Sequence, residues 1–176
     1  MADIIKDREI IADDWIVIRL AEGETATAIA LPEGKLIVPL AVWQLRRDEL
    51  SKRGTLGIWL SDSEGPELIA DDLEYFEVVA IDFPKFSNGR GYSSASLLRT
   101  RYSYRGELRA IGDVLRDQMF YLLRVGFNAI ALRPDRSIQD ALNALNDFSV
   151  TYQTSTDETQ PLFRRVNRVV TSREPK

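Results

Sequence analysis

The chain contains no cysteine and no histidine among its 176 residues. Without cysteine it has no disulfide, no thiolate nucleophile and no cysteine-ligated zinc or iron–sulfur cluster. Without histidine it also lacks the most common transition-metal ligand and the side chain that most often carries protons near neutral pH. We therefore expect no metal site, and the electrons for any redox role must come from a bound cofactor or a partner protein.

Long apolar runs are also missing from the sequence. No stretch approaches the roughly 20 apolar residues that a membrane-spanning helix needs. The first residues, "MADIIKDREIIADDW", carry acids where a signal peptide has a basic region followed by an apolar one. Hydrophobic residues make up 44% of the chain and charged residues 28%, as is usual for a soluble globular protein. The sequence thus predicts a cytoplasmic protein that does not contact membranes.

Charge is distributed unevenly along the chain, although the net charge is only −4. Residues 1–84 carry 8 Lys and Arg against 18 Asp and Glu, whereas residues 85–124 carry 8 against 3. The overall acidic balance argues against nucleic-acid binding. The local basic segment favours a small anion or an acidic partner surface.

Short apolar runs alternate with longer amphipathic runs over most of the sequence. This pattern predicts strands at 35–40, 55–60, 77–83, 106–112 and 128–132, a sixth strand at 149–153, and helices at 41–54, 65–76, 93–104, 114–125 and 137–148. Residues 4–20 alternate loosely around a charged break, which predicts an N-terminal β-hairpin.

Strands that are separated by helices predict a mostly parallel sheet, because parallel strands require crossover connections. We therefore expect an α/β protein with a five- or six-stranded sheet of βα repeats, either an open doubly wound sheet or a partial barrel. Residues 1–153 are predicted to form a single domain. Residues 154–176 form a polar tail with a candidate short helix at 161–170. Both architectures bind ligands at the carboxyl ends of the strands.

The stretch "FPKFSNGRGYSS", residues 83–94, follows the third predicted βα strand and is unusually rich in polar groups. Asn88 and Gly89 are typical of backbone with positive φ, and Gly91 would let a backbone N–H approach a ligand closely. With Lys85, Arg90 and the start of the following helix, this loop predicts an anion site. "GRGYSS" matches the dinucleotide-binding pattern only in part, because the third glycine is missing. The alternative is a surface loop in which the glycines only turn the chain.

The segment "GELRAIGDVLRDQMFYLLRVGF" contributes two more candidate residues, Asp113 and Arg116. Asp113 is placed to cap the following helix or to bind a ribose hydroxyl. Arg116 either forms an ordinary surface ion pair or reaches the same mouth as Lys85 and Arg90, where the three cations would bind an oxyanion. Arg133, at the end of the fifth of these strands, either reaches this mouth or begins a solvated turn.

The central run from Phe83 to Asp135, "FPKFSNGRGYSSASLLRTRYSYRGELRAIGDVLRDQMFYLLRVGFNAIALRPD", resembles a bacterial family of unknown function. "IVPLAVW", "LGIWL" and "DFSVTYQ" are similar to the same family, so the resemblance covers residues 1–153. Its members are encoded beside assimilatory sulfite or nitrite reductases and are labelled as oxidoreductases of sulfite reduction, a label inferred from gene neighbourhood. The resemblance implies a pathway, and it supplies no catalytic residue.

Two hypotheses about function follow. In the first, the protein is an accessory of assimilatory sulfite reduction that binds a small oxyanion or a nucleotide at the carboxyl ends of its strands. In the second, it is a non-enzymatic interaction protein whose basic surface docks on a sulfite reductase or an electron carrier. The second hypothesis requires a set of arginines to point outward: Arg99, Arg101, Arg105 and Arg109. A chain without cysteine is not itself expected to be a sulfite reductase, because it cannot hold the metal centres through thiolates.

Overall fold

The computed structural model describes residues 2–85 and 87–165, and these residues form an α/β structure with an eight-stranded mixed sheet. The strand order is β2-β1-β8-β7-β6-β5-β4-β3. Neighbours from β3 to β8 are parallel, whereas β1 is antiparallel to both β8 and β2. The strands are β1 (Asp3–Lys6), β2 (Glu9–Ala12), β3 (Trp15–Val17), β4 (Lys35–Pro39), β5 (Leu56–Leu60), β6 (Val78–Phe83), β7 (Glu107–Gly112) and β8 (Ala129–Ile130).

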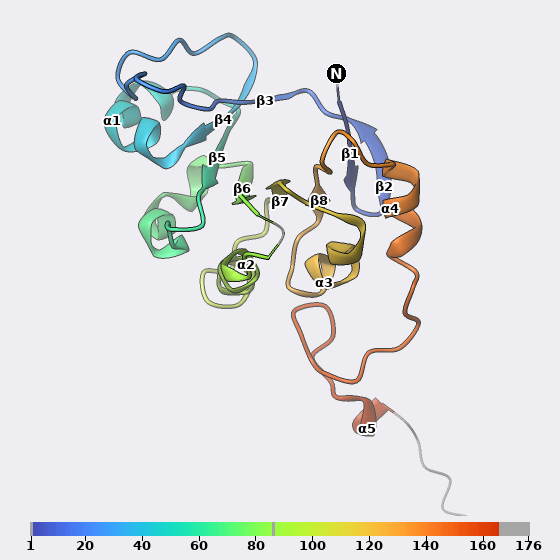
Figure 1. Cartoon of the computed structure of the whole chain (residues 1–176). Helices are drawn as coiled ribbons and strands as arrows, with labels where there is room; N and C mark the ends of the chain where they lie inside the picture. Colours follow the sequence, from blue (N-terminus) through green and yellow to red (C-terminus); the bar gives the residue numbers. More distant parts are fainter. Residues whose placement is uncertain (1, 86, 166–176) are drawn as a thin grey trace, which may run out of the picture.

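Helical segments follow each parallel strand from β4 onward and lie outside the curve of the sheet (Figure 1). They are α1 (Leu40–Leu50), η1 (Pro66–Tyr75), α2 (Arg90–Thr100), η2 (Arg116–Gln118), α3 (Met119–Arg124), α4 (Ile138–Ala144) and α5 (Leu162–Arg165). The predicted helix at 65–76 is a 3₁₀ helix that starts with Pro66, and α2 begins three residues earlier than predicted. The crossover pattern that the sequence indicated is therefore present.

The sheet curls into a half-barrel because its two edge strands are consecutive in sequence. Only Asp13 and Asp14 separate the end of β2 from the start of β3. A flat eight-stranded sheet would place these edges about 34 Å apart at the usual interstrand spacing. The three Cα–Cα steps from Ala12 to Trp15 span at most about 11 Å. The sheet must therefore bend until its two edges approach each other (Figure 1).

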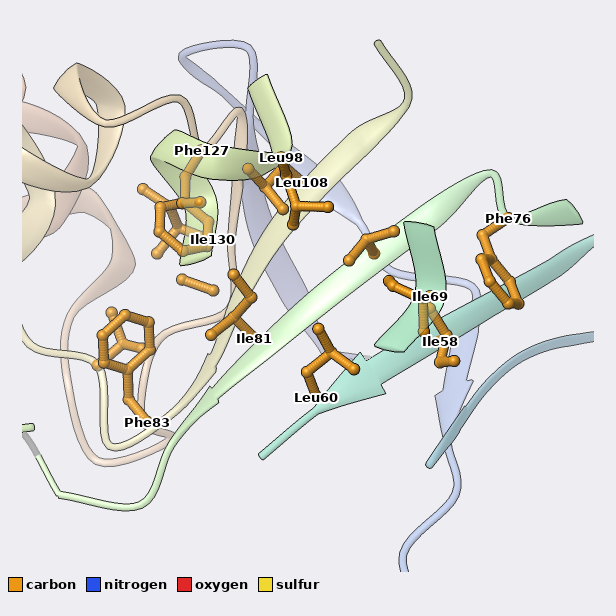
Figure 2. Close-up of a cluster of buried hydrophobic side chains, with 14 of the residues drawn as sticks. Ile58, Leu60, Ile69, Phe76, Ile81, Phe83, Leu98, Leu108, Phe127 and Ile130 are labelled. Carbon is orange, nitrogen blue, oxygen red and sulfur yellow. The ribbon is translucent and has the colours of Figure 1, made fainter. Parts of the chain in front are cut away.

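The two faces of the curled sheet bury different kinds of side chain. The outer face packs on the helices through a continuous apolar core, in which Phe83, Leu98 and Phe127 lie between β6, α2 and the start of β8 (Figure 2). The inner face holds a smaller apolar cluster that includes Val78 and Ile111 and contains no residue from a helix among the described residues. Because α1, η1, α2, α3 and α4 all pack on the outer face, the architecture is the partial barrel and not the open doubly wound sheet.

A buried ion network lies on the inner face of the half-barrel. The Arg109 side chain is 1% exposed; its Nη1 donates to both carboxylate oxygens of Asp13, at 3.0 and 2.9 Å, and its Nε donates to Glu107 at 2.6 Å. The Nζ of Lys6 pairs with the other Glu107 oxygen at 2.8 Å. The network thus joins the middle of the sheet on β7 to the Asp13–Asp14 link between the two edge strands.

Two details of the predicted fold are wrong, and a third is tested only in part. The sheet has eight strands where five or six were expected, because the N-terminal residues supply β3 at the far edge in addition to the predicted β1–β2 hairpin. Residues 149–153 form no strand. They have no free edge beside β8, because β1 occupies it through the pairs Ile5–Ile130 and Lys6–Ala129. Of the helix predicted at 161–170, α5 covers the first part, and 166–170 lie outside the described residues.

Within the described ranges, no helix combines the length and the apolar character that crossing a membrane would require.

Candidate functional site

The candidate site is a hollow at the carboxyl ends of β5 and β6. Its lining residues come from the two loops that follow these strands. The hollow has a volume of about 610 Å³, and we call it the Lys85 hollow. Its lining residues are Asp62, Pro84, Lys85, Ser87, Asn88 and Gly89. The structure therefore brings together Lys85, Asn88 and Gly89 of the predicted set, in the place that the fold class favours for ligands.

Asn88 fixes the geometry of the hollow by linking its two loops. Its Nδ2 donates to Oδ2 of Asp62 at 2.6 Å, and its Oδ1 accepts the backbone N–H of Arg90 at 3.1 Å. Its own backbone N–H donates to the Lys85 carbonyl oxygen at 3.0 Å, which closes a turn. Asn88 is therefore held on three sides and positions both the Asp62 carboxylate and the first residue of α2.

Positive charge at the carboxyl ends of β5 and β6 comes from Lys85 and Arg90, which are both exposed. Neither forms an ion pair with a carboxylate of the described residues. Arg19, Arg116 and Arg133, which also lie near the carboxyl ends of the strands, each form one. The eleven-residue helix α2 also begins here, with Gly89 at its N-cap, so its positive dipole end adds to the two charges. The charge available for an anion is therefore concentrated on Lys85, in the loop after β6, and on Arg90, at the start of α2.

The two glycines of the loop have other roles than the sequence suggested. Gly89 has φ −86°, and Asn88 is not among the residues with positive φ, so the prediction of left-handed backbone here is wrong. Gly91 is buried, and a Cβ on it would lie 2.7 Å from the ring of Phe83. Gly91 thus allows α2 to pack closely on β6, and its absent side chain serves the core and not a ligand.

Asp113 lies at the end of β7 and is paired with Arg133. Nη1 of Arg133 donates to Oδ1 of Asp113 at 2.8 Å, and the guanidinium also binds Asp135. The Asp135 and Asp113 carboxylates raise the pKa of Arg133 well above its usual range. The predicted helix cap at Asp113 is wrong, because η2 begins only at Arg116, after Leu115.

Arg116 lines a different hollow and does not line the Lys85 hollow. It pairs with Asp147 at 3.0 Å and with Asp140 at 3.2 Å, and the hydrogen bonds that it donates to these carboxylates raise its pKa. The second hollow, of about 350 Å³, is formed by Leu115, Arg116, Asp117, Arg136, Ser137 and Asp140. The surface ion pair expected as the simpler alternative is what the structure contains.

Arg19 lies near the candidate site, although the sequence did not predict it as a site residue. Its Nη2 donates to Oδ1 of Asp82 at the end of β6 at 2.6 Å, and its guanidinium lies over the Trp59 ring, 5.0 Å from the centroid. A third hollow beside this pair, of about 290 Å³, is lined by Arg19, Leu20, Pro39, Ala41, Trp59, Ser61 and Glu64. The alternation Trp15, Val17, Arg19 was the available signal, because it assigns Arg19 to the inner face of the sheet.

Comparison of the chain with known proteins gives one result about its family. A family model described as "Bacterial protein of unknown function (DUF934)" matches residues 57–163, which include both loops of the Lys85 hollow. No curated protein matches the chain. In the part of the chain that the structure describes, no three acidic residues gather as metal ligands would.

Proposed function

The chain belongs to DUF934, a family of bacterial proteins of unknown function, and we propose that it is an accessory protein of assimilatory sulfite reduction that binds a small anion in the Lys85 hollow. The pathway part of this proposal rests on the resemblance of residues 1–153 to proteins encoded beside sulfite reductases. The binding part rests on the geometry at the carboxyl ends of β5 and β6. The two parts are independent and need separate tests.

The observation that carries the binding part is that some cations near the carboxyl ends of the strands are paired with carboxylates and others are not. Arg19, Arg116 and Arg133 are already neutralised by carboxylates 2.6–3.0 Å away. Lys85 and Arg90 have no such partner among the described residues; Lys85 lines the hollow, and Arg90 is the first residue of α2, directly after the lining residue Gly89. An anion would therefore gain two charges there without displacing an existing ion pair. The predicted site is narrower than expected, since Asp113 and Arg116 take no part in it.

The composition of the chain favours ligand binding over electron transfer by the chain itself. With no cysteine and no histidine, the protein offers neither thiolates nor imidazoles to a metal centre. An accessory role, in which the protein holds a sulfur oxyanion or an activated ester of one, is compatible with this composition. The reaction that uses the bound ligand would belong to a partner reductase.

Calorimetric titration tests the binding part. We expect sulfite, sulfate, adenylylated sulfate or a nicotinamide nucleotide to bind, and Lys85→Ala to weaken binding roughly 10- to 100-fold, the equivalent of one charge-assisted hydrogen bond. The matched control is Lys52→Ala, because Lys52 also has no carboxylate partner among the described residues and lies at the end of α1. No heat from any of these ligands with folded protein would reject the site.

Growth of a bacterium that carries this gene tests the pathway part. Deletion of the gene should slow growth on sulfate and leave growth on cysteine unchanged. Equal growth of the deletion strain and its parent on sulfate would reject the pathway while leaving the binding site open to test.

A docking protein is the second candidate, and the exposed Arg101 and Arg105 favour it, because neither pairs with a carboxylate of the described residues. Arg109 cannot contribute, since it is buried, and Arg99 binds the carbonyl oxygens of Tyr104, Gly106 and Gly126. A pull-down from a sulfate-grown lysate should then retain a reductase or electron carrier at low salt and lose it at high salt. Capture that does not change with salt would contradict this candidate.

A further inference from the structure

The Lys85 hollow contains a carboxylate as well as a lysine, and this restricts the ligands that fit it. Asp62 lines the hollow together with residues of the loop after β6. Its Oδ2 accepts from Asn88 Nδ2, and it forms no ion pair with any cation of the described residues. An ionised carboxylate has two acceptor oxygens and no donor. Asp62 therefore repels a bare oxyanion and attracts a hydroxyl group.

The Asp62 carboxylate cannot easily turn away from a ligand. Asn88 holds it through a 2.6 Å bond, and Asn88 is itself held by Arg90 N–H and by its own turn to the Lys85 carbonyl oxygen. The hollow is thus lined both by this held acceptor and by Lys85, whose ammonium group pairs with no carboxylate of the described residues. A ligand that satisfies both groups needs an anionic group and a hydroxyl group on one small molecule.

The size of the hollow agrees with this requirement. Its volume of about 610 Å³ falls within the range of about 300–1,000 Å³ that is typical of sites for small organic ligands. A single sulfate or phosphate ion would leave most of that space to water. Most of its lining residues have polar side chains, which suits a hydroxylated ligand.

We propose that the Lys85 hollow binds a phosphate or sulfate ester of a polyol, with the ester group at Lys85 and the α2 N-terminus and a hydroxyl group on the Asp62 carboxylate. This inference rests on the proposed anion site and specifies its ligand class. It excludes inorganic sulfite or sulfate as the preferred ligand, and it assigns Asp62 as the residue that selects between the two classes.

Two probes of the same charge separate the contributions. Ribose 5-phosphate carries the ester and several hydroxyl groups, whereas methyl phosphate carries the ester alone. Calorimetry on the full chain should show ribose 5-phosphate binding at least 10-fold more tightly. Lys85→Ala should weaken both ligands by a similar factor, because both present a phosphate to Lys85.

Substitution of Asp62 by Asn should affect the two probes differently. The Asp62→Asn variant should bind ribose 5-phosphate more weakly than wild type. It should bind methyl phosphate as tightly as wild type or more tightly, since the repulsion by the carboxylate is gone. Circular dichroism melting controls for folding. Equal affinity of wild-type protein for the two probes overturns the inference, as does an equal loss for both in Asp62→Asn, which would make Asp62 only a support for the loop.

Failure of the underlying anion site gives a different result. If neither probe nor any inorganic oxyanion binds the folded wild-type protein, the proposed function is rejected together with the inference. If inorganic phosphate and methyl phosphate bind and ribose 5-phosphate gains nothing, the anion site stands and the ligand class assigned here is wrong.

Discussion

Replacing Arg109 by Met tests whether the buried ion network holds the curl of the sheet. Arg109 is 1% exposed and contacts the carboxylates of both Asp13 and Glu107. Methionine keeps most of the side-chain volume and removes the charge. The Asp13 carboxylate then loses its only ion-pair partner in the described structure, and Glu107 keeps only Lys6. Breaking one side of a buried ion pair costs about 3–5 kcal/mol, because the remaining charge is left without compensation.

Urea unfolding followed by circular dichroism measures this loss. With a slope of about 2 kcal/mol per molar urea, a loss of about 4 kcal/mol moves the midpoint down by roughly 2 M. The matched control is Arg136→Met, because Arg136 is half exposed and its pair with Asp135 is 3.6 Å long. Such a surface pair contributes at most about 1 kcal/mol.

A second variant separates the charge from the packing. Arg109→Met combined with Glu107→Leu and Asp13→Leu removes the buried charges together, so it should recover part of the stability that Arg109→Met alone loses. Lys6 is partly exposed and its ammonium group can then reach water. A loss of stability in Arg109→Met no greater than that in Arg136→Met would contradict this role of the ion network, and so would a triple variant that is less stable than Arg109→Met.

Two further predictions concern packing and pH. Gly91→Ala should lower the free energy of unfolding by about 1–3 kcal/mol, because the new Cβ would lie 2.7 Å from the Phe83 ring. Gly89→Ala should change it by less than about 0.5 kcal/mol, because the nearest neighbour of that Cβ lies at 4.0 Å. Similar losses in the two variants would contradict the packing role of Gly91. Burial raises the pKa of Tyr104, so the stability that its neutral form contributes is present below the pKa of about 10 of an unfolded tyrosine and is lost as the pH rises above it. Tyr104→Phe should therefore be about 1 kcal/mol less stable than wild type at pH 7, because it loses the hydrogen bond to the Phe76 carbonyl oxygen. This difference in unfolding free energy should become smaller by pH 11. A difference that stays the same in urea unfolding at the two pH values would refute this.

Local apolar patterning was sufficient to predict β4 to β8, because each of these strands is a short run of buried residues between polar connections. It could not predict β3, since Trp15–Val17 pairs with β4 across a loop and lies at the opposite sheet edge from its neighbour β2. The segment at 149–153 has the composition of a strand, yet the edge of β8 is already bonded by β1. Strand order depends on this competition for edges, which leaves no signal in a local window.

The candidate site was predictable in position but only partly in composition. Lys85, Asn88 and Gly89 follow directly from the loop after β6, so the strand pattern places them correctly. Whether a cation is available for a ligand depends on carboxylates that are distant in sequence. Arg116 is neutralised by Asp147, 31 residues away. Asp62 enters the hollow from a different loop, 26 residues before Asn88. Such partners become visible only when the chain is folded.

The curl of the sheet also connects the fold to the candidate site. Because only Asp13 and Asp14 join the two edge strands, β3 is drawn back against β4, and the residues that follow it reach the carboxyl ends of the strands. That path brings Arg19 onto Asp82 near the end of β6, three residues before Lys85. The pairing neutralises a carboxylate that would otherwise face the same edge and repel an anion there. The N-terminal strands therefore influence the electrostatics of a site to which they contribute no lining residue.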